Sequence, residues 1–284
     1  MRNIDQHNIT QAVIGRLTNC DNPRLKEVLT SLVTHLHDFV RETRLTEEEW
    51  MQGIAFLTDT GHMCTGQRQE FILLSDTLGV SMLTVALNQA RPPGATEATV
   101  FGPFHVDDAP PVEAGADIAR GAPGEPLFVD IEVVGLDGKA IAGASVDVWQ
   151  ADEDGLYDVQ RPELGEERRA RGVLRTDAAG RTHFRTIVPT AYPVPTDGPV
   201  GRMLVASGRH PWRPAHVHFL IHASGFQTLT THIFREPDPY LDSDVVFGVR
   251  SSLIGQFERH ERGPRADTPY FTLSQRFVLA PQAA

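Results

Sequence analysis

The sequence predicts a mainly β protein in which an all-helical N-terminal domain precedes a β-sandwich. Apolar residues recur at helical spacing up to about residue 90. After Arg91-Pro92-Pro93-Gly94 the apolar and polar residues alternate in short runs that Gly, Pro and Asp separate. No helical pattern is interleaved among those runs, which favours packed sheets over an α/β fold. We therefore expect a helical domain at 1–95 and a β-sandwich domain at 96–284.

Three helical segments are expected in the first domain. The first begins after Asn22 and carries an apolar stripe. Thr46 and Glu49 have the spacing of a capping box and should open the second helix. The third stretch runs from about Gln67 to Leu87 and is expected to break at Gly79. The stripe of the first helix consists of Leu25, Val28, Leu29, Leu32, Leu36, Phe39 and Val40.

The second domain is expected to consist of short strands. Val129, Ile131 and Val133 alternate with polar or outward-facing neighbours, and Asp137-Gly138 has the composition of a turn. Val146 and Val148 continue the alternation. Further strands are expected at 182–188, 203–206, 216–221, 229–234 and 271–279.

Composition and charge exclude several classes of protein. The 26 basic and 37 acidic residues give a net charge of −11, which argues against binding to nucleic acid or to an anionic membrane surface. No segment reaches the roughly 18 unbroken apolar residues of a membrane span, and residues 1–18 do not have the pattern of a secretory signal. Cys20 and Cys64 provide no disulfide framework, so a reducing cytoplasm is expected.

The strongest local signal is Pro214-Ala215-His216-Val217-His218-Phe219. On a strand, His216 and His218 share one face while Val217 and Phe219 point to the other. Two imidazoles in this arrangement can bind one metal ion. Paired histidines on a strand can equally be hydrogen-bonded or exposed side chains, so this motif alone leaves both interpretations open.

Other residues of the chain help to decide between a metal site and ordinary hydrogen-bonded or exposed histidines. No Cys lies near the two histidines in sequence and no H-E-x-x-H motif is present, which removes the commonest zinc patterns. The chain has four tyrosines. Two of them have distinctive contexts, Tyr157 in Gly155-Leu156-Tyr157-Asp158 and Tyr192 in Thr190-Ala191-Tyr192-Pro193-Val194-Pro195.

With these motifs the sequence resembles the intradiol ring-cleavage dioxygenases, the family of the catechol, chlorocatechol, protocatechuate and hydroxyquinol dioxygenases. The matching motifs are V-F-G-P-F at 100–104, V-D-V-W-Q-A-D with G-x-Y at 146–157, Y-P-V-P at 192–195 and R-P-A-H-V-H-F at 213–219. They span nearly the whole chain in the same order. In that family a helical segment precedes a β-sandwich that carries a non-haem iron.

The resemblance implies that Tyr157, Tyr192, His216 and His218 bind Fe(III). A hard, highly charged cation favours ionised phenols, whose ordinary pKa is about 10. Tyr192 corresponds to the tyrosine that leaves the iron when the diol binds and takes a diol proton. Arg213 corresponds to an arginine that stabilises negative charge on the ring; it can alternatively be a buried ion-pair partner.

The resemblance also implies a substrate pocket. Asp76 stands where catechol-cleaving relatives carry an apolar residue or proline, and His232 stands where they carry Gln; the hydroxyquinol enzymes carry such an aspartate. Asp76 can accept a hydrogen bond from a third ring hydroxyl, or it can cap a helix near Thr77 or face water. The expected pocket residues are Leu73, Asp76, Val100, Phe101, Gly102, Pro103, Phe104, Val194, Pro195, Arg213 and Val246.

The expected reaction is cleavage of hydroxyquinol (benzene-1,2,4-triol) by O2, with cleavage of catechol or a substituted catechol as the alternative. Two other classes remain open, a metal-free binding module and a zinc hydrolase that uses His216, His218 and Asp158. The resemblance further implies a homodimer formed through the helical domain, with a lipid bound there in relatives.

Overall fold

The computed structural model describes residues 2–66 and 68–282. The chain forms two compact units, one ending at Asp59 and the other beginning at Thr60. Helices α4 (Glu70–Thr77) and α5 (Val80–Asn88) therefore belong to the larger unit. The boundary between the units does not coincide with the division expected at residue 95. That division stays a prediction.

The smaller unit is helical. It contains α1 (Ile9–Gly15), η1 (Arg16–Asn19), α2 (Pro23–Thr43) and most of α3 (Glu47–His62). The Asn22 side chain accepts a hydrogen bond from Leu25 N and Pro23 occupies the first turn, so α2 begins where the sequence predicts. The capping box is confirmed, because Glu49 Oε2 accepts from Thr46 N at 2.9 Å and Thr46 Oγ1 accepts from Glu49 N at 3.2 Å. Helix α1 was not predicted.

The third helical stretch is two helices, α4 (Glu70–Thr77) and α5 (Val80–Asn88). The break predicted at Gly79 is confirmed: this residue has φ of 75° and the two helices make an angle of 77°. Gln67, where the stretch was expected to begin, lies outside the described residues. Among the described helices, none is by itself long and apolar enough to cross a membrane, and α4 and α5 meet such a criterion only when taken together across their bend.

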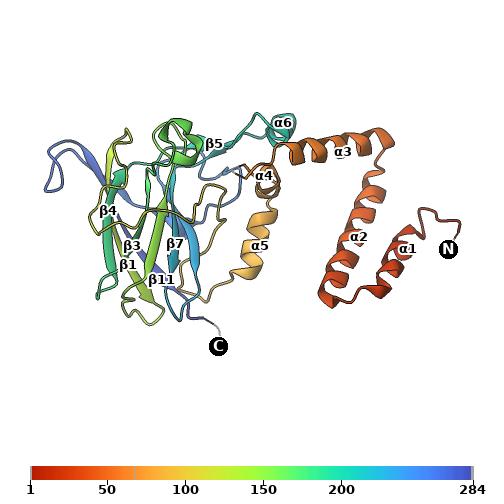
Figure 1. Ribbon diagram of the computed structural model, residues 1–284, viewed down its shortest axis with the longest axis horizontal. Coiled ribbons are helices and arrows are strands. Elements are labelled where there is room, and N and C mark those ends of the chain that lie inside the picture. Colours follow the sequence, from red (N-terminus) through yellow and green to blue (C-terminus); the bar gives the residue numbers. More distant parts are fainter. Residues whose placement is uncertain (1, 67, 283–284) are drawn as a thin grey trace. The chain divides into compact units, whose positions relative to one another are not determined.

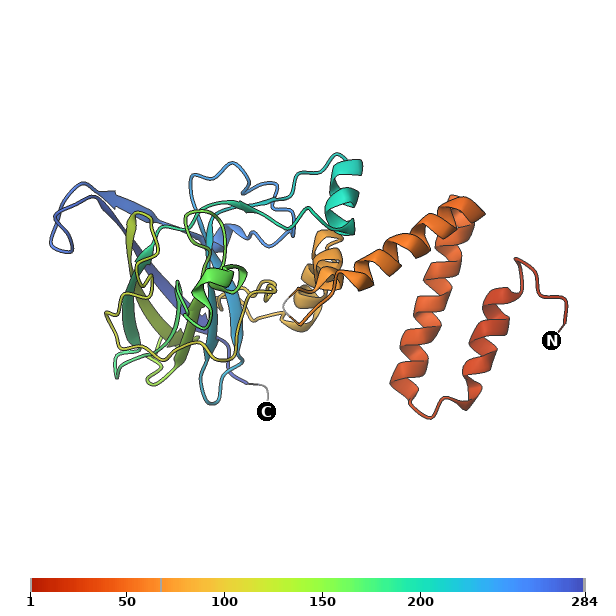
Figure 2. The same ribbon diagram turned by 45° about the horizontal axis from the view of Figure 1, so that its top comes forward.

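The larger unit is a β-sandwich (Figures 1 and 2). One sheet has the order β10 (Phe257–His260), β11 (Tyr270–Leu279), β1 (Pro126–Gly135) and β4 (Arg181–Ile187). The other has the order β3 (Arg171–Arg175), β2 (Ser145–Trp149), β7 (His216–His222), β8 (Leu229–Arg235) and β9 (Ile254–Gly255). A two-stranded ribbon pairs β5 (Tyr192–Pro193) with β6 (Trp212–Arg213). Short 3-10 turns are η2 (Asp158–Gln160), η3 (Pro162–Leu164) and η4 (Ser251–Leu253).

The strand predicted at 203–206 is wrong, because this segment ends helix α6 (Pro199–Ala206). Pro199 occupies the first helical turn after Gly198, a position that Pro favours. Val200 and Leu204 are buried while Val205 is exposed, which is a helical burial pattern. The four residues at 203–206 are too few for their apolar pattern to distinguish the 3.6-residue period of a helix from the two-residue period of a strand.

The core lies between the two sheets and determines which face of β7 carries the histidines. Val217 and Phe219 are completely buried in this core with residues of the opposite sheet such as Val129 and Phe277. Since strand side chains alternate, His216 and His218 project from the other face of the same strand. Packing of the sandwich thus directs both imidazoles to one place.

Candidate metal centre and substrate pocket

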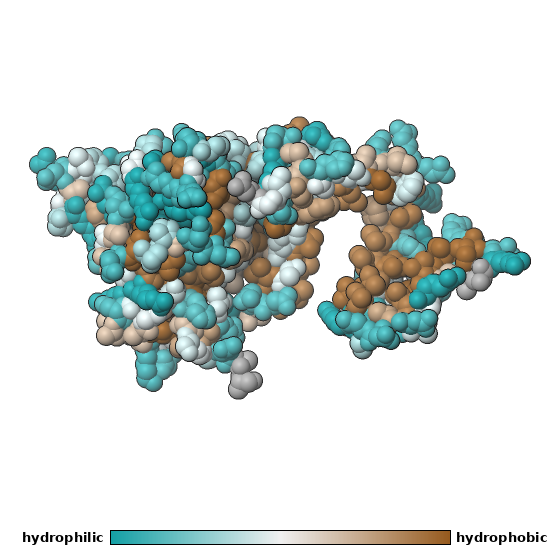
Figure 3. Space-filling model, in the orientation of Figure 1, coloured by the Kyte–Doolittle hydropathy of each residue, from teal (hydrophilic) through white to brown (hydrophobic). Residues whose placement is uncertain are grey.

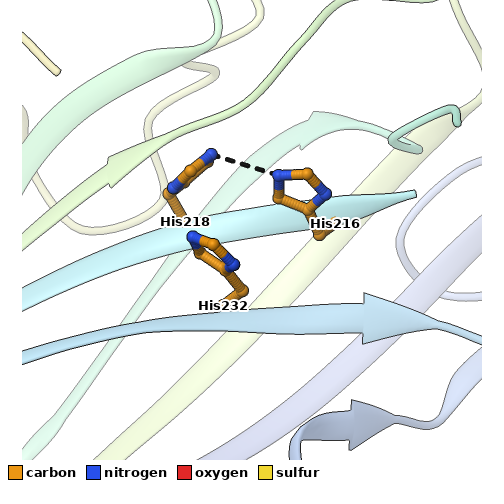
Figure 4. A group of neighbouring side chains, drawn as sticks. All are labelled: His216, His218 and His232. Atoms are coloured by element: carbon orange, nitrogen blue, oxygen red, sulfur yellow. Dashed lines mark hydrogen bonds between the residues drawn. The ribbon is translucent and has the colours of Figure 1, made fainter. Parts of the chain in front are cut away.

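Three histidines from two neighbouring strands point to the same side of the sheet (Figure 4). His216 and His218 lie on β7 with their Nε2 atoms 3.1 Å apart. His232 lies on β8 directly opposite His218, and the two ring centroids are 4.1 Å apart. One ring nitrogen from each of the three lies within 4.8 Å of the others, and all three residues are at most 2% exposed.

Both distinctive tyrosines join this group. The hydroxyl of Tyr157 lies 2.8 Å from His218 Nε2 and 3.1 Å from the hydroxyl of Tyr192. Tyr157 is completely buried, whereas Tyr192 is 5% exposed and lines the adjacent pocket. The two phenols and two imidazoles expected to bind metal are therefore contiguous, although they come from three separate stretches of the chain.

A tight turn brings the two tyrosines together. Asp152 Oδ1 accepts hydrogen bonds from Asp154 N and Leu156 N, and Gly155 within the turn has φ of 79°. A Cβ at Gly155 would lie 2.6 Å from Cβ of Tyr192, so only glycine permits this approach. Tyr192 is in turn held by the pairing of β5 with Arg213 on β6.

Aromatic stacking fixes the orientation of two of the rings. Trp149, paired with His218 between β2 and β7, stacks on its imidazole at a centroid distance of 4.7 Å and an interplanar angle of 15°. Phe104 stacks on Tyr157 at 4.4 Å and 23°. A Cβ at Gly102 would lie 3.1 Å from His218 Cε1. Packing therefore restrains these rings before any ligand binds.

The protonation of Tyr157, His216 and His218 fits a bound cation. His216 Nδ1 lies 2.7 Å from the carbonyl oxygen of Pro214, which can only accept, so Nδ1 carries the proton and the Nε2 lone pair faces the cluster. Burial lowers the pKa of His216 and His218 well below the usual range and keeps both imidazoles neutral. Burial and the neighbouring Tyr192 raise the pKa of Tyr157 well above its ordinary value, so its ionisation requires a nearby cation. Two phenols and two neutral imidazoles are a donor set that suits Fe(III).

Arg213 is a buried ion-pair partner, and it also lies at the pocket. Its guanidinium pairs with Asp244, with Nε 3.2 Å from Oδ1, and both residues are at most 5% exposed. It also lines the pocket and lies 3.2 Å from His216 Nε2 through NH1. Burial alone would lower the pKa of Arg213, but Asp244 and the two tyrosines hold it above the usual value, so the cation is permanent.

A pocket of about 200 Å³ adjoins the cluster and contains most of the expected substrate residues. Phe101 differs from the expectation: it does not line the pocket, is 45% exposed, and packs on His105 at 4.7 Å. Its positive-φ neighbour Gly102 turns the chain there, so adjacent residues of the motif point in different directions. The expected residues that do line the pocket are Leu73, Asp76, Val100, Gly102, Pro103, Phe104, Val194, Pro195, Arg213 and Val246.

Sequence reasoning missed four lining residues, Arg68, Gln69, Glu70 and Gln160. Glu70 is 1% exposed and accepts hydrogen bonds from Arg68 at 2.9 Å and from Val200 N at 3.2 Å. The only sequence signal was the charged pair directly before the apolar run of α4. Nothing in the sequence indicates that α6 would approach it.

Asp76 lies inside α4 with 6% exposure, so it neither caps a helix nor faces water. Residue Gly79 occupies the N-cap position of α5 instead. Burial raises the pKa of Asp76, although a hydrogen bond with Ser81 and the charge of Arg213 act in the opposite direction. A buried carboxyl thus forms part of the wall of the pocket that a permanent cation also lines.

Asp158 is not available as a metal ligand. Its carboxylate forms a buried ion pair with Arg171, whose Nε lies 2.8 Å from Oδ2, and it also accepts from Arg169 N. Arg171 additionally donates to the carbonyl of Phe104. The pair therefore connects strand β3 to the segments that carry Tyr157 and Phe104, and the zinc site that would use Asp158 does not form.

Comparison with known proteins agrees with this geometry. The family described as "Catechol dioxygenase N terminus" matches residues 22–96, and the family described as "Dioxygenase" matches residues 100–280. The fold, the site and these matches define a ring-cleavage dioxygenase. The chain belongs to the intradiol dioxygenases. A metal-free binding module is thereby excluded.

Within this family the chain is similar to enzymes that act on hydroxyquinols. It is 60% identical to the 6-chlorohydroxyquinol 1,2-dioxygenase of Cupriavidus pinatubonensis, over 99% of each chain. It is 48% identical to the hydroxyquinol 1,2-dioxygenase of a Rhizobium species, over 95% of this chain and 94% of the relative. The solved structure of hydroxyquinol 1,2-dioxygenase from Pseudomonas putida superimposes with a TM-score of 0.89 at 45% identity, covering 98% of this chain and 99% of the other.

Proposed function

We propose that this chain cleaves hydroxyquinol with O2 between its two adjacent hydroxylated carbons. The product is 3-hydroxy-cis,cis-muconate, which tautomerises to maleylacetate. The observation that carries this proposal is the buried carboxyl of Asp76 in the wall of a pocket that also contains Tyr192 and Arg213. The similarity to hydroxyquinol enzymes supports the same choice.

Asp76 distinguishes a triol from a diol through hydrogen bonding. Its carboxyl has a hydrogen bond with Ser81, and its neighbours in the wall, including Leu73, Val100 and Val246, are apolar. The third hydroxyl of hydroxyquinol supplies a further donor from the pocket side, whereas catechol supplies none. An unsatisfied buried polar group costs about 1–3 kcal/mol, and more when it is charged. Sites built to bind a substrate hydroxyl therefore discriminate strongly against analogues that lack it.

We further propose that Tyr157, Tyr192, His216 and His218 hold Fe(III). When bound, Fe(III) supplies a Lewis acid and electron acceptor for the two adjacent ring oxygens. Tyr192 lines the pocket and Tyr157 does not, so the Tyr192 oxygen, once ionised by the bound metal, would be the one that takes a proton from the diol. Arg213 stabilises the negative charge that develops on the ring. Phe104, Val194 and Pro195 hold the ring and exclude water.

Oxygen uptake tests the choice of substrate. The iron-loaded protein is assayed with hydroxyquinol and with catechol in parallel, and autoxidation of hydroxyquinol is subtracted with boiled enzyme. We expect kcat/KM for hydroxyquinol to exceed that for catechol by at least about 100-fold, the scale that loss of one buried charged hydrogen bond sets. A preference for catechol would contradict the proposal that hydroxyquinol is the substrate, but it would not contradict the proposed metal centre.

Colour and metal content test the iron ligands. Phenolate bound to Fe(III) gives a wine-red protein, and Tyr192 still supplies one phenolate after Tyr157→Phe. We therefore expect Tyr157→Phe to lose most of its iron and to show a weaker and shifted visible band for each iron that remains. Tyr270→Phe is the matched control, because Tyr270 is also buried but lies on β11 in the opposite sheet. An unchanged iron content together with an unchanged band in Tyr157→Phe would rule out this residue as a ligand.

We also infer that the chain forms a homodimer through its helical unit. Leu25, Val28, Leu32, Leu36 and Phe39 of α2 are each 44–52% exposed. Figure 3 shows apolar surface gathered over the helical unit. An apolar row of this length is usually covered by a partner. We further propose a lipid bound at the helices and a cytoplasmic location, with which the free thiols of Cys20 and Cys64 are compatible. The division into a helical domain at 1–95 and a catalytic domain at 96–284 is part of the same proposal.

A further inference from the structure

We propose that Arg209 is a positioning residue that sets substrate preference by holding two walls of the substrate pocket in register. The inference rests on the proposed function, because the wall it controls carries Asp76. Arg209 belongs to none of the sequence motifs, and it does not line the pocket. Its role follows from the two backbone carbonyls to which it donates.

Arg209 connects α4 to the segment that follows β8. Its NH1 donates to the carbonyl of Thr77 at 2.6 Å, and its NH2 donates to the carbonyl of Val245 at 3.0 Å. Its own backbone amide bonds to the carbonyl of Leu204 at 2.9 Å, so its position is fixed by α6. The guanidinium thereby joins two segments that are far apart in the sequence, and the backbone amide of the same residue joins them to α6.

Both accepting residues are direct neighbours of pocket residues. Thr77 follows Asp76 in the last turn of α4. Val245 stands between Asp244, the ion-pair partner of Arg213, and Val246 of the pocket wall. Movement of either carbonyl would therefore change the separation between the carboxyl of Asp76 and the guanidinium of Arg213.

The C-terminus of α4 needs such a donor. Gly79 ends the helix and the chain turns by 77° into α5. The last carbonyls of a helix lack intrahelical partners and carry partial negative charge, so a cation that donates to one of them is favoured. Arg209 supplies this cation from another element, which ties the end of α4 to the pocket.

Phe247 completes the arrangement. It adopts φ of 61°, a left-handed conformation that is unfavourable for a bulky residue. The Arg209 guanidinium lies 5.2 Å from the centroid of its ring, and the same ring is the nearest neighbour to the Cβ position of Gly79. The planar guanidinium can donate to two carbonyls and cover the ring at once, which a lysine ammonium on a flexible stem cannot do.

The test compares Arg209→Met and Arg209→Lys with wild type and with Arg91→Met as a matched control. Arg91 also donates to a backbone carbonyl at 2.6 Å, that of Thr228, but it does not line the pocket and its partner lies outside the pocket wall. Each iron-loaded protein is titrated anaerobically with hydroxyquinol and with catechol, and the change in its visible band gives Kd for each. Steady-state oxygen uptake then gives kcat and KM, and iron content and Tm are recorded.

For Arg209→Met we expect Kd and KM for hydroxyquinol to rise by about 10-fold to 100-fold, the scale that misplacement by about 1 Å produces. The values for catechol should change less than about 3-fold, because catechol does not use Asp76. The Kd and KM of Arg209→Lys for hydroxyquinol should lie between those of Arg209→Met and those of the wild type. Arg91→Met should leave the ratio of the two Kd values unchanged.

Equal losses with both substrates, together with a lower Tm, would overturn the inference and make Arg209 a structural residue only. An unchanged ratio of Kd values in Arg209→Met would also overturn it. A wild-type protein that prefers catechol would overturn the proposed substrate instead. In that case a changed ratio in Arg209→Met still supports control of the pocket by Arg209.

Discussion

At the scale of single residues, Asp76 shows a conflict between specificity and stability. Burial raises its pKa in the folded protein above the value in the unfolded chain. The protonated form is thus favoured by folding, and this contribution is fully present below the unfolded pKa and is lost as pH rises through the folded pKa. At pH values above the folded pKa the ionised carboxyl therefore favours unfolding.

Asp76→Asn is therefore expected to be more stable than wild type at pH 7 and to lose this advantage as the pH approaches 4. The same variant should lose at least about 10-fold in kcat/KM with hydroxyquinol, because the amide is a poorer acceptor than the carboxylate. Thermal unfolding across a pH series measures the first effect and oxygen uptake the second. Asp267→Asn, on an exposed position of the β10–β11 connection, should match wild type in both. A Tm difference that does not vary with pH would contradict the assignment.

Other residues show why motif reading reached only part of the site. His216, His218, Tyr157 and Tyr192 stand in motifs whose spacing carries the chemistry. Glu70 and Arg209 lie in the pocket region too, and each has a hydrogen bond to a backbone group more than 100 positions away. Such contacts leave no local pattern in a sequence, because a backbone carbonyl or amide can be supplied by any residue type.

At the scale of elements, the turn that ends in Tyr157 is as important as the strand that carries the histidines. We expect Gly155→Ala to disturb both tyrosines, because its Cβ would overlap Tyr192 and its φ of 79° is unfavourable for alanine. The variant should bind iron at least about 10-fold more weakly, the scale seen when groups that orient metal ligands are removed. Iron content after dialysis against a chelator gives the measurement.

Gly143→Ala is the matched control for this prediction. Gly143 has φ of 72°, and nothing lies within 4 Å of the position its Cβ would take. It therefore adds a similar backbone strain, on the order of 1 kcal/mol, without the collision. If both variants lost iron equally, strain and not the approach of Tyr192 would be the cause.

Elements with a strong local signal were predicted and others were not. The cap of α2, the capping box of α3 and the break at Gly79 each depend on residues within one turn of the boundary. The strand expected at 203–206 is part of a helix that begins at Pro199. The four apolar residues of this segment fit a strand as well as a helix, so they do not distinguish the two. Burial against α4 decides that it is a helix.

At the scale of the whole molecule, the exposed apolar face of α2 predicts association. Leu32→Lys combined with Leu36→Lys should weaken the dimer by at least about 100-fold, since charged groups at the centre of an apolar interface are strongly unfavourable. Sedimentation velocity across a concentration series measures this. Glu27→Lys is the control, because Glu27 is highly exposed and lies on the opposite face of the same helix. This substitution should leave the association unchanged. A wild-type protein that remains monomeric at high concentration would exclude the dimer.

Hydrophobic periodicity in the sequence predicts the helical part and the β-sandwich, because it defines which residues can share a buried face. The family was indicated by the resemblance of four motifs to the intradiol dioxygenases, and the same resemblance pointed to Asp76 as the candidate for substrate preference. The tertiary structure was needed to show that Asp76 is buried in the pocket that Arg213 also lines, that Phe101 lies outside this pocket, and that Arg209 bonds to Thr77 and Val245. These facts arise from packing between segments distant in sequence, where burial and approach distance depend on the whole fold and not on neighbouring residues.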